Sequence, residues 1–222
     1  MYIKRYLEKQ LRNTYWQLKG IGFFNLIPLI GLYILIPISN VITYQFYQEP
    51  EYLYVNIVKE CQFFCPLLSI WWIFFLLEHF IEEPGNELLF VDGRNKLVNV
   101  LIPYIGFMIL MIPLFVVYTA LFSELWWLYW KLAIVNLLYV SIAYFAAFLS
   151  KKIVISLIFA LCYTIDAILE ETMGISGISY YNAQVMTGWE MVNEMKVFLI
   201  MTMLFLLAGM VCNYCFPYRN RQ

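Results

Sequence analysis

Residues 97–123 read LVNVLIPYIGFMILMIPLFVVYTALFS, and no charged side chain interrupts them. A helix needs about 20 apolar residues to cross the hydrocarbon core of a bilayer, and this stretch is longer than that. Lys96 precedes the stretch and Glu124 follows it, so charges stand where a spanning helix would meet water. The stretch therefore predicts a transmembrane helix.

The whole chain has the same apolar character. Of its 222 residues, 63% are hydrophobic and only 13% are charged, and its mean hydropathy is +0.73. Soluble domains carry about 25% charged residues. Its 14 basic and 15 acidic side chains are too few to cover a soluble surface. This composition excludes an ordinary soluble enzyme, a disordered regulator and a nucleic-acid-binding module, and it makes the lipid bilayer the first expected partner.

Charged residues divide the chain into six apolar stretches, and none of these shows the period-two alternation of a membrane barrel. Helices are the expected spanning form, because lipid offers no hydrogen-bond partner to backbone groups. Pro28 and Pro37 should bend the first span. We expect an all-α membrane protein in which residues 1–222 form a single transmembrane domain. The expected spans are 20–42, 61–81, 97–123, 132–150, 153–169 and 197–216.

The basic residues are distributed unevenly between the two sides that six spans would define. Eleven fall on the side of the termini and three on the other, and cytoplasmic loops are the ones enriched in Lys and Arg. Both termini are therefore expected in the cytoplasm. The eleven are Lys4, Arg5, Lys9, Arg12, Lys19, Arg94, Lys96, Lys151, Lys152, Arg219 and Arg221.

Residues 1–18 form an amphipathic pattern that is too polar to span. Ile3, Leu7, Leu11, Tyr15 and Leu18 recur at helical spacing, while Lys4 and Arg5 belong to the polar remainder. The pattern predicts a helix that lies in the cytoplasmic interface of the membrane. The alternative is a basic N-terminal tail that only satisfies the charge asymmetry.

The connection 82–96, between the second and third expected spans, begins acidic and ends basic. Its apolar centre, residues 88–91, has no reason to face water, and a short helix that docks into a partner would explain it. The alternative is that the second span continues into the cytosol and packs on its neighbours. The residues that carry the pattern are Glu82, Glu83, Gly85, Asn86, Glu87, Leu88, Leu89, Phe90, Asp92 and Arg94.

This order of elements resembles the permease subunits of type-2 ABC exporters. Those proteins have an interfacial N-terminal helix, six spans, and a loop after the second span with Glu, then Gly, then a Leu-rich run, then basic residues. Glu82, Gly85, Leu88, Leu89 and Arg94 follow that order. The chain departs from the family pattern at Asn86, where threonine is usual.

The resemblance implies a permease that pairs with a second permease copy and with two cytoplasmic ATPase subunits, in a bacterial cytoplasmic membrane. The loop 82–96 would couple to the ATPase. No G-x-x-x-x-G-K-S/T motif is present. The chain is therefore expected to be non-catalytic and to bind no cofactor or metal, with ATP and magnesium held by the partner. The alternative function is a non-transporting scaffold or sensor subunit.

The expected cargo is a hydrophobic or amphipathic peptide, antibiotic or drug. Few charges lie inside the spans to replace the hydration of an ion, and the second span is rich in aromatic residues. The candidates for lining the pathway are Phe64, Trp71, Trp72 and Phe75.

Three further features leave alternatives open. Residues 170–195, with their glycines and aromatic residues, suit either short re-entrant helices or an ordinary outer loop. Asp166 suits the outer interface better than a functional site within the bilayer. Gly174-Ile175-Ser176-Gly177 matches the nucleophile motif of rhomboid proteases, but the only histidine is His79, which precedes it.

Overall fold

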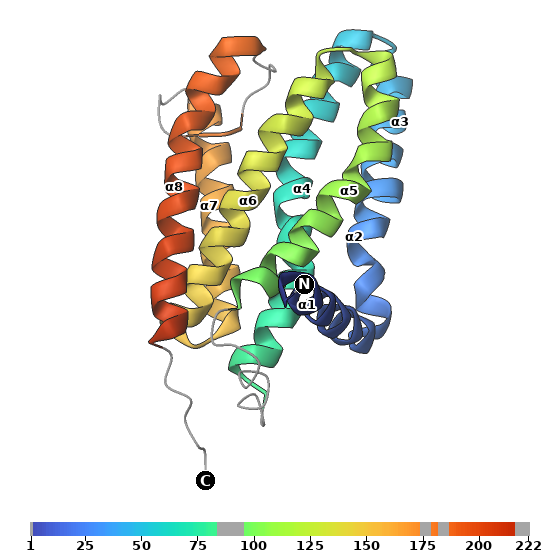
Figure 1. Ribbon diagram of the computed structural model, residues 1–222. Helices are drawn as coiled ribbons and strands as arrows, with labels where there is room; N and C mark the ends of the chain where they lie inside the picture. The colour runs from blue at the N-terminus through green and yellow to red at the C-terminus, as the bar shows by residue number, and fades with distance from the viewer. Residues whose placement is uncertain (1, 84–95, 174–178, 182–186, 216–222) are drawn as a thin grey trace.

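The computed structural model describes residues 2–83, 96–173, 179–181 and 187–215, and within these ranges it is helical without any strand (Figure 1). Six helical segments are long and apolar enough to cross a membrane. The chain thus has the build of a multi-span membrane protein. The α-helices are α1 Tyr2–Gly20, α2 Ile27–Ile30, α3 Ile36–Tyr47, α4 Pro50–Ile81, α5 Leu97–Leu121, α6 Leu125–Ser150, α7 Ile153–Met173 and α8 Gly188–Tyr214.

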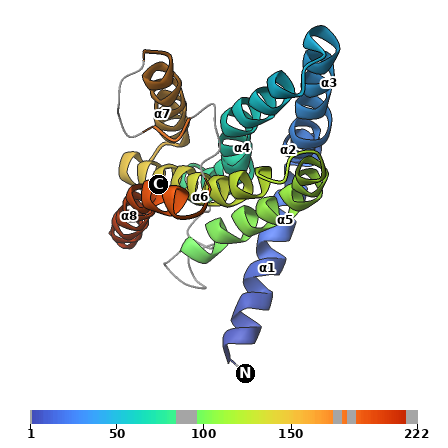
Figure 2. The ribbon, with the colours of Figure 1, turned by 90° about the horizontal axis from the view of Figure 1, so that it is seen from above.

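Helix α6 occupies the centre of the bundle. Seen from above, α4, α5, α7 and α8 surround it, and the first span, which contains α2 and α3, lies outside α4 and α5 (Figure 2). Helix α1, the turn at 151–152 and the C-terminal end of α8 lie together, at what we call the α1 end (Figure 1). The turns that join α3 to α4 and α5 to α6 lie at the opposite end, the far end.

The first span changes helix type at its prolines. A 3₁₀ helix, Gly22–Leu26, leads into α2, where Pro28 takes an N-terminal position. A π-helix, Gly31–Leu35, then leads into α3, where Pro37 does the same. Proline has no backbone N–H and clashes with the preceding turn, and the wide π-turn before Pro37 accommodates both effects. The expected bend is therefore taken up as local changes of helical pitch.

Three helices begin earlier than the uncharged stretches suggest. Helix α4 begins at Pro50 rather than Cys61, α6 at Leu125 rather than Leu132, and α8 at Gly188 rather than Val197. The spans expected from the sequence start just after the charges at 59–60, Lys131 and Lys196. A lysine does not end a helix, so each helix continues through these positions. Proline in the first turn of α4 is a helix-start signal that lies well before Lys59.

Helices α6 and α8 approach closely at Gly209. A Cβ atom at this position would lie 2.5 Å from Cδ1 of Tyr144 and 3.3 Å from the Cα of Phe145. The Tyr144 ring is completely buried, so it has little room to move. Membrane helices lack a hydrophobic drive toward one another and depend on such small residues for close packing.

We therefore predict that Gly209→Ala destabilises the protein by about 1–3 kcal/mol, because its new methyl group overpacks the α6–α8 contact. The matched control is Gly106→Ala in α5, where a Cβ atom would meet nothing within 4 Å. That variant should be neutral or slightly more stable, since alanine favours helix. Thermal unfolding of both variants in dodecyl maltoside measures the difference, and equal midpoints would contradict the prediction.

Candidate functional site

Helix α1 lies across the α1 end of the bundle, at a steep angle to the other helices (Figure 2). Its protein-facing side is polar: Gln10 and Thr14 are buried, and the Asn99 side-chain amide of α5 donates a 2.8 Å hydrogen bond to Gln10 Oε1. Its apolar side faces outward, with Leu11 52% and Tyr15 61% exposed. The bundle therefore contacts α1 through Gln10, Thr14 and the partly buried Leu18, and it leaves Leu11 and Tyr15 uncovered.

An uncovered apolar face on a helix that lies across a membrane bundle suits the headgroup region of a bilayer. Leu11 belongs to the apolar face expected from the sequence, and it lies on the uncovered side. The side chains of Lys4, Arg5 and Leu7 lie outside the described part of the structure. The interfacial position of α1 stays a prediction.

The first residues of the expected coupling loop are anchored to neighbouring elements. Glu82 Oε1 accepts a 2.7 Å hydrogen bond from the backbone N–H of Ile153, the first residue of α7. Glu83 Oε2 lies 2.5 Å from His79 Nδ1 in the last turn of α4. A carboxylate at a helix N-terminus satisfies a backbone donor that has no partner within the helix. Glu82 therefore ties the end of α4 to the start of α7.

The other end of the loop is also held in the bundle. Lys96 is only 3% exposed, and its Nζ lies 5.4 Å from the ring centroid of Phe80. The residues between these anchors fall within 84–95, outside the described residues. They include the predicted coupling residues Gly85, Asn86, Glu87, Leu88, Leu89, Phe90, Asp92 and Arg94.

The aromatic residues expected to line a pathway pack against other helical segments. The indole N–H of Trp71 donates to the Phe24 carbonyl at 2.9 Å, and that of Trp72 donates to the Asn25 carbonyl at 3.0 Å. Phe75 lies beside Phe24, with ring centroids 6.3 Å apart. These three side chains hold the 3₁₀ segment of the first span against α4.

Phe64 is half-buried and packs edge-on against Phe63, with ring centroids 4.9 Å apart. Like Trp71, Trp72 and Phe75, it lies on α4 and belongs to the interior of this chain at least in part. A pathway role for these four residues stays a prediction.

A charge cluster near the far end, made of one buried lysine and three partly buried side chains, was missed by the sequence reasoning. Lys59 Nζ on α4 lies 3.6 Å from Glu171 Oε1 on α7. Lys131 on α6 is 1% exposed, and its Nζ has no hydrogen-bond partner among the described residues. The carboxylates of Glu194 on α8 and Glu171 act on it electrostatically. Charges from four helices thus meet in the bundle.

The signal for this cluster was present in the sequence. Lys131 follows a run of apolar residues, 125–130. Such a run indicates that the helix containing Lys131 begins before it. Only the rotation of α6 decides that Lys131 points into the bundle rather than toward water. Ionisable groups inside a membrane bundle are costly and usually pair with one another.

Residues 179–181 fold back along α7 instead of lying beyond its end (Figure 1). The buried Tyr180 hydroxyl lies 2.7 Å from the Tyr139 hydroxyl, which lies 2.7 Å from Thr164 Oγ1. Ser179 Oγ donates to the Ala167 carbonyl at 2.8 Å. Thr164 is nine residues before the end of α7 at Met173, or about 13 Å along the helix. This part of residues 170–195 is therefore packed inside the bundle.

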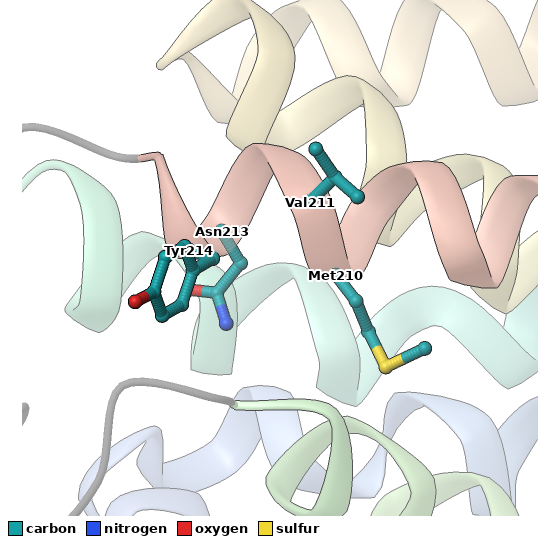
Figure 3. Close-up of a pocket in the computed structure, with 4 residues that line it drawn as sticks. All are labelled: Met210, Val211, Asn213 and Tyr214. Carbon is teal, nitrogen blue, oxygen red and sulfur yellow. The ribbon is translucent and has the colours of Figure 1, made fainter.

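Two of the cavities have apolar walls. One of about 300 Å³ lies beside the last turns of α8 and is lined by Met210, Val211, Asn213 and Tyr214 (Figure 3). Another, of about 220 Å³, is a groove between α6, α7 and α8, with Phe145 and Phe205 among its walls. Neither brings catalytic groups together, and no cluster of His, Cys, Asp or Glu suited to a metal occurs among the described residues.

Comparison with known proteins does not assign the chain to a family. No family model matches the chain, and no curated protein or solved structure matches it significantly. The functional argument therefore depends on the residues and the geometry described above.

We predict that Lys131→Met destabilises the protein by about 3 kcal/mol, because it leaves the carboxylates of Glu194 and Glu171 with less counter-charge in the bundle. Lys196→Met is the matched control, since Lys196 is exposed on α8 and should change stability by less than about 0.5 kcal/mol. Adding Glu194→Gln to Lys131→Met should restore part of the loss. Thermal unfolding in dodecyl maltoside measures all three, and equal midpoints for the two lysine variants would refute the charge cluster.

Proposed function

We propose that this chain is the membrane-spanning permease subunit of an ATP-driven exporter of the type-2 ABC class. Two copies would form the translocation pathway, and two separate ATPase subunits would dock at the α1 end, on the cytoplasmic side of a bacterial membrane. The observation that supports this most is the set of contacts that links α1, the two ends of the loop 82–96 and the start of α7 at one end of the bundle.

These contacts form a mechanical connection. Gln10 joins α1 to Asn99 in the first turn of α5, and Glu82 joins the end of α4 to Ile153 of α7. The loop between Glu83 and Lys96 connects α4 directly to α5. A subunit that bound this loop would thus pull on α1, α4, α5 and α7 together, which is what an ATPase needs in order to change the conformation of a permease.

ATP binding can drive such a change only if it alters the relative affinity of the ATPase for the two conformations of the permease. In the proposed mechanism, closure of the ATPase pair moves the loops and the interfacial helices, and the pathway between the permeases switches from inward-facing to outward-facing. ATP and magnesium act in the ATPase alone. The proposed cargo is a hydrophobic or amphipathic peptide, antibiotic or drug.

We predict that an ATPase subunit encoded beside this chain co-purifies with it, and that Leu88→Asp combined with Leu89→Asp abolishes the pairing. Burying two carboxylates in an apolar docking surface would cost more free energy of desolvation than the docking contact contributes. Asn95→Asp is the control, because it adds charge to the same loop without removing an apolar side chain. Affinity purification from membranes followed by quantification of the ATPase measures the effect.

Unchanged pairing in the double variant would remove the loop from the docking site while leaving the permease assignment open to another surface. Failure of the unmodified chain to pair with an ATPase would instead favour the scaffold or sensor function. The two outcomes are separated by whether the unmodified chain retains the ATPase.

A further inference from the structure

A third cavity, of about 640 Å³, opens at the far end between the α3–α4 turn and the α5–α6 turn. Its walls include Glu51 and Tyr54 of α4, and Phe122 and Glu124 of the α5–α6 turn. Pro50 and Leu121 add apolar surface. Ligand sites are typically concavities of about 300–1,000 Å³, largely apolar, with a few convergent polar groups. This cavity has that size and that composition.

The charged groups that line the cavity are both acidic, and its other polar side chains are the neutral hydroxyls of Tyr54 and Ser123. Glu51 and Glu124 supply two carboxylates, and no basic residue is among the described residues that line the cavity. The Tyr54 hydroxyl donates to Glu124 Oε2 at 3.4 Å, and the Tyr54 ring packs edge-on against Phe122. Carboxylates beside aromatic rings are the combination that recognises ammonium groups, through charge attraction and cation–π contact.

The surroundings increase the attraction for cations. Nine acidic side chains but only three basic ones lie toward the far end of the described chain, and two of the three, Lys59 and Lys131, belong to the charge cluster described above. A surface of one sign raises the local concentration of oppositely charged ligands. The helix N-termini at α4 and α6 explain why an acid occupies each position. They do not explain why both acids border one cavity with aromatic walls.

We propose that this far-end cavity binds an alkylammonium or arylalkylammonium group carried on an apolar body. The carboxylates of Glu51 and Glu124 would hold the cation, Tyr54 and Phe122 would contact its faces, and Pro50 and Leu121 would contact the apolar part. The site is formed by one chain and needs no ATPase, so it stands independently of the proposed export function. A lipid choline head group and a soluble organic cation share this chemistry.

The test uses the full chain, purified alone in dodecyl maltoside, and tritiated benzyltrimethylammonium as the probe in equilibrium dialysis. Glu51→Gln combined with Glu124→Gln should weaken binding about tenfold, because two opposite charges beside the cation are lost. Glu190→Gln removes an exposed carboxylate of α8 that does not line the cavity, and it should change binding less than about twofold. Raising NaCl from about 0.05 M to about 0.5 M should also weaken binding.

Competition with glycerophosphocholine distinguishes the two sources of the ligand. Displacement of the probe supports a lipid head group as the occupant, and binding of the probe without such displacement supports a soluble cation. Equal affinity of the unmodified chain and the double variant would overturn the site, provided that both elute as the same species in size-exclusion chromatography. If Glu190→Gln lost as much affinity as the double variant, the loss would come from the general surface charge. That result would also overturn the proposed site.

Discussion

An unpaired backbone N–H or carbonyl group in hydrocarbon costs several kcal/mol, and this cost governs the architecture of the chain. Each of the six candidate spans is helical, so most of its backbone groups bond within the span, and the first passes from 3₁₀ to α to π and back to α. Some carbonyls of the first span accept instead from side chains of α4. Once the backbone is satisfied locally, apolar side chains no longer drive the helices together, because lipid is as apolar as they are. What holds the bundle is close packing and polar contact. Gly209 against Tyr144, and Lys59 against Glu171, are examples of each.

Polar contacts occur at both ends of the bundle and differ between them. At the α1 end, the Gln10–Asn99 hydrogen bond links α1 to α5, and the Glu82–Ile153 hydrogen bond links the end of α4 to α7. Near the far end, the Lys59–Glu171 ion pair ties α4 to α7, and deeper in the bundle the Tyr139–Tyr180 contact ties the segment at 179–181 to α6. An exporter needs one end to receive a partner and the other to open, and this difference supports that proposal. It also places the far-end cavity away from the surface proposed for the ATPase.

Sequence reasoning predicted the helical class and the six apolar segments, because hydropathy and helix length are local properties. Its spans at 61–81 and 132–150 begin after Glu60 and Lys131, whereas the helices α4 and α6 that contain them begin earlier. Lys59 and Lys131 both lie within helices and take part in the charge cluster, in which only Lys131 is buried. It singled out Trp71 and Trp72 by residue type alone, and the structure shows their indole N–H groups donating to carbonyls of the first span. The local sequence of residues 170–195 could not distinguish a loop from a re-entrant segment, because its glycine and aromatic content suits both.

The sequence by itself determined that this protein has six helices apolar enough to span a membrane, that its basic residues gather on one side, and that an amphipathic segment precedes the spans. These properties depend on composition and on spacing of a few residues. Only the tertiary structure decided that Lys131 is buried within electrostatic reach of Glu194 and Glu171, that Tyr180 reaches Tyr139, and that Glu51 and Glu124 border one cavity. Each of these pairs joins residues far apart in the chain. Their meeting depends on how each helix is rotated and tilted against its neighbours, and no local pattern encodes that.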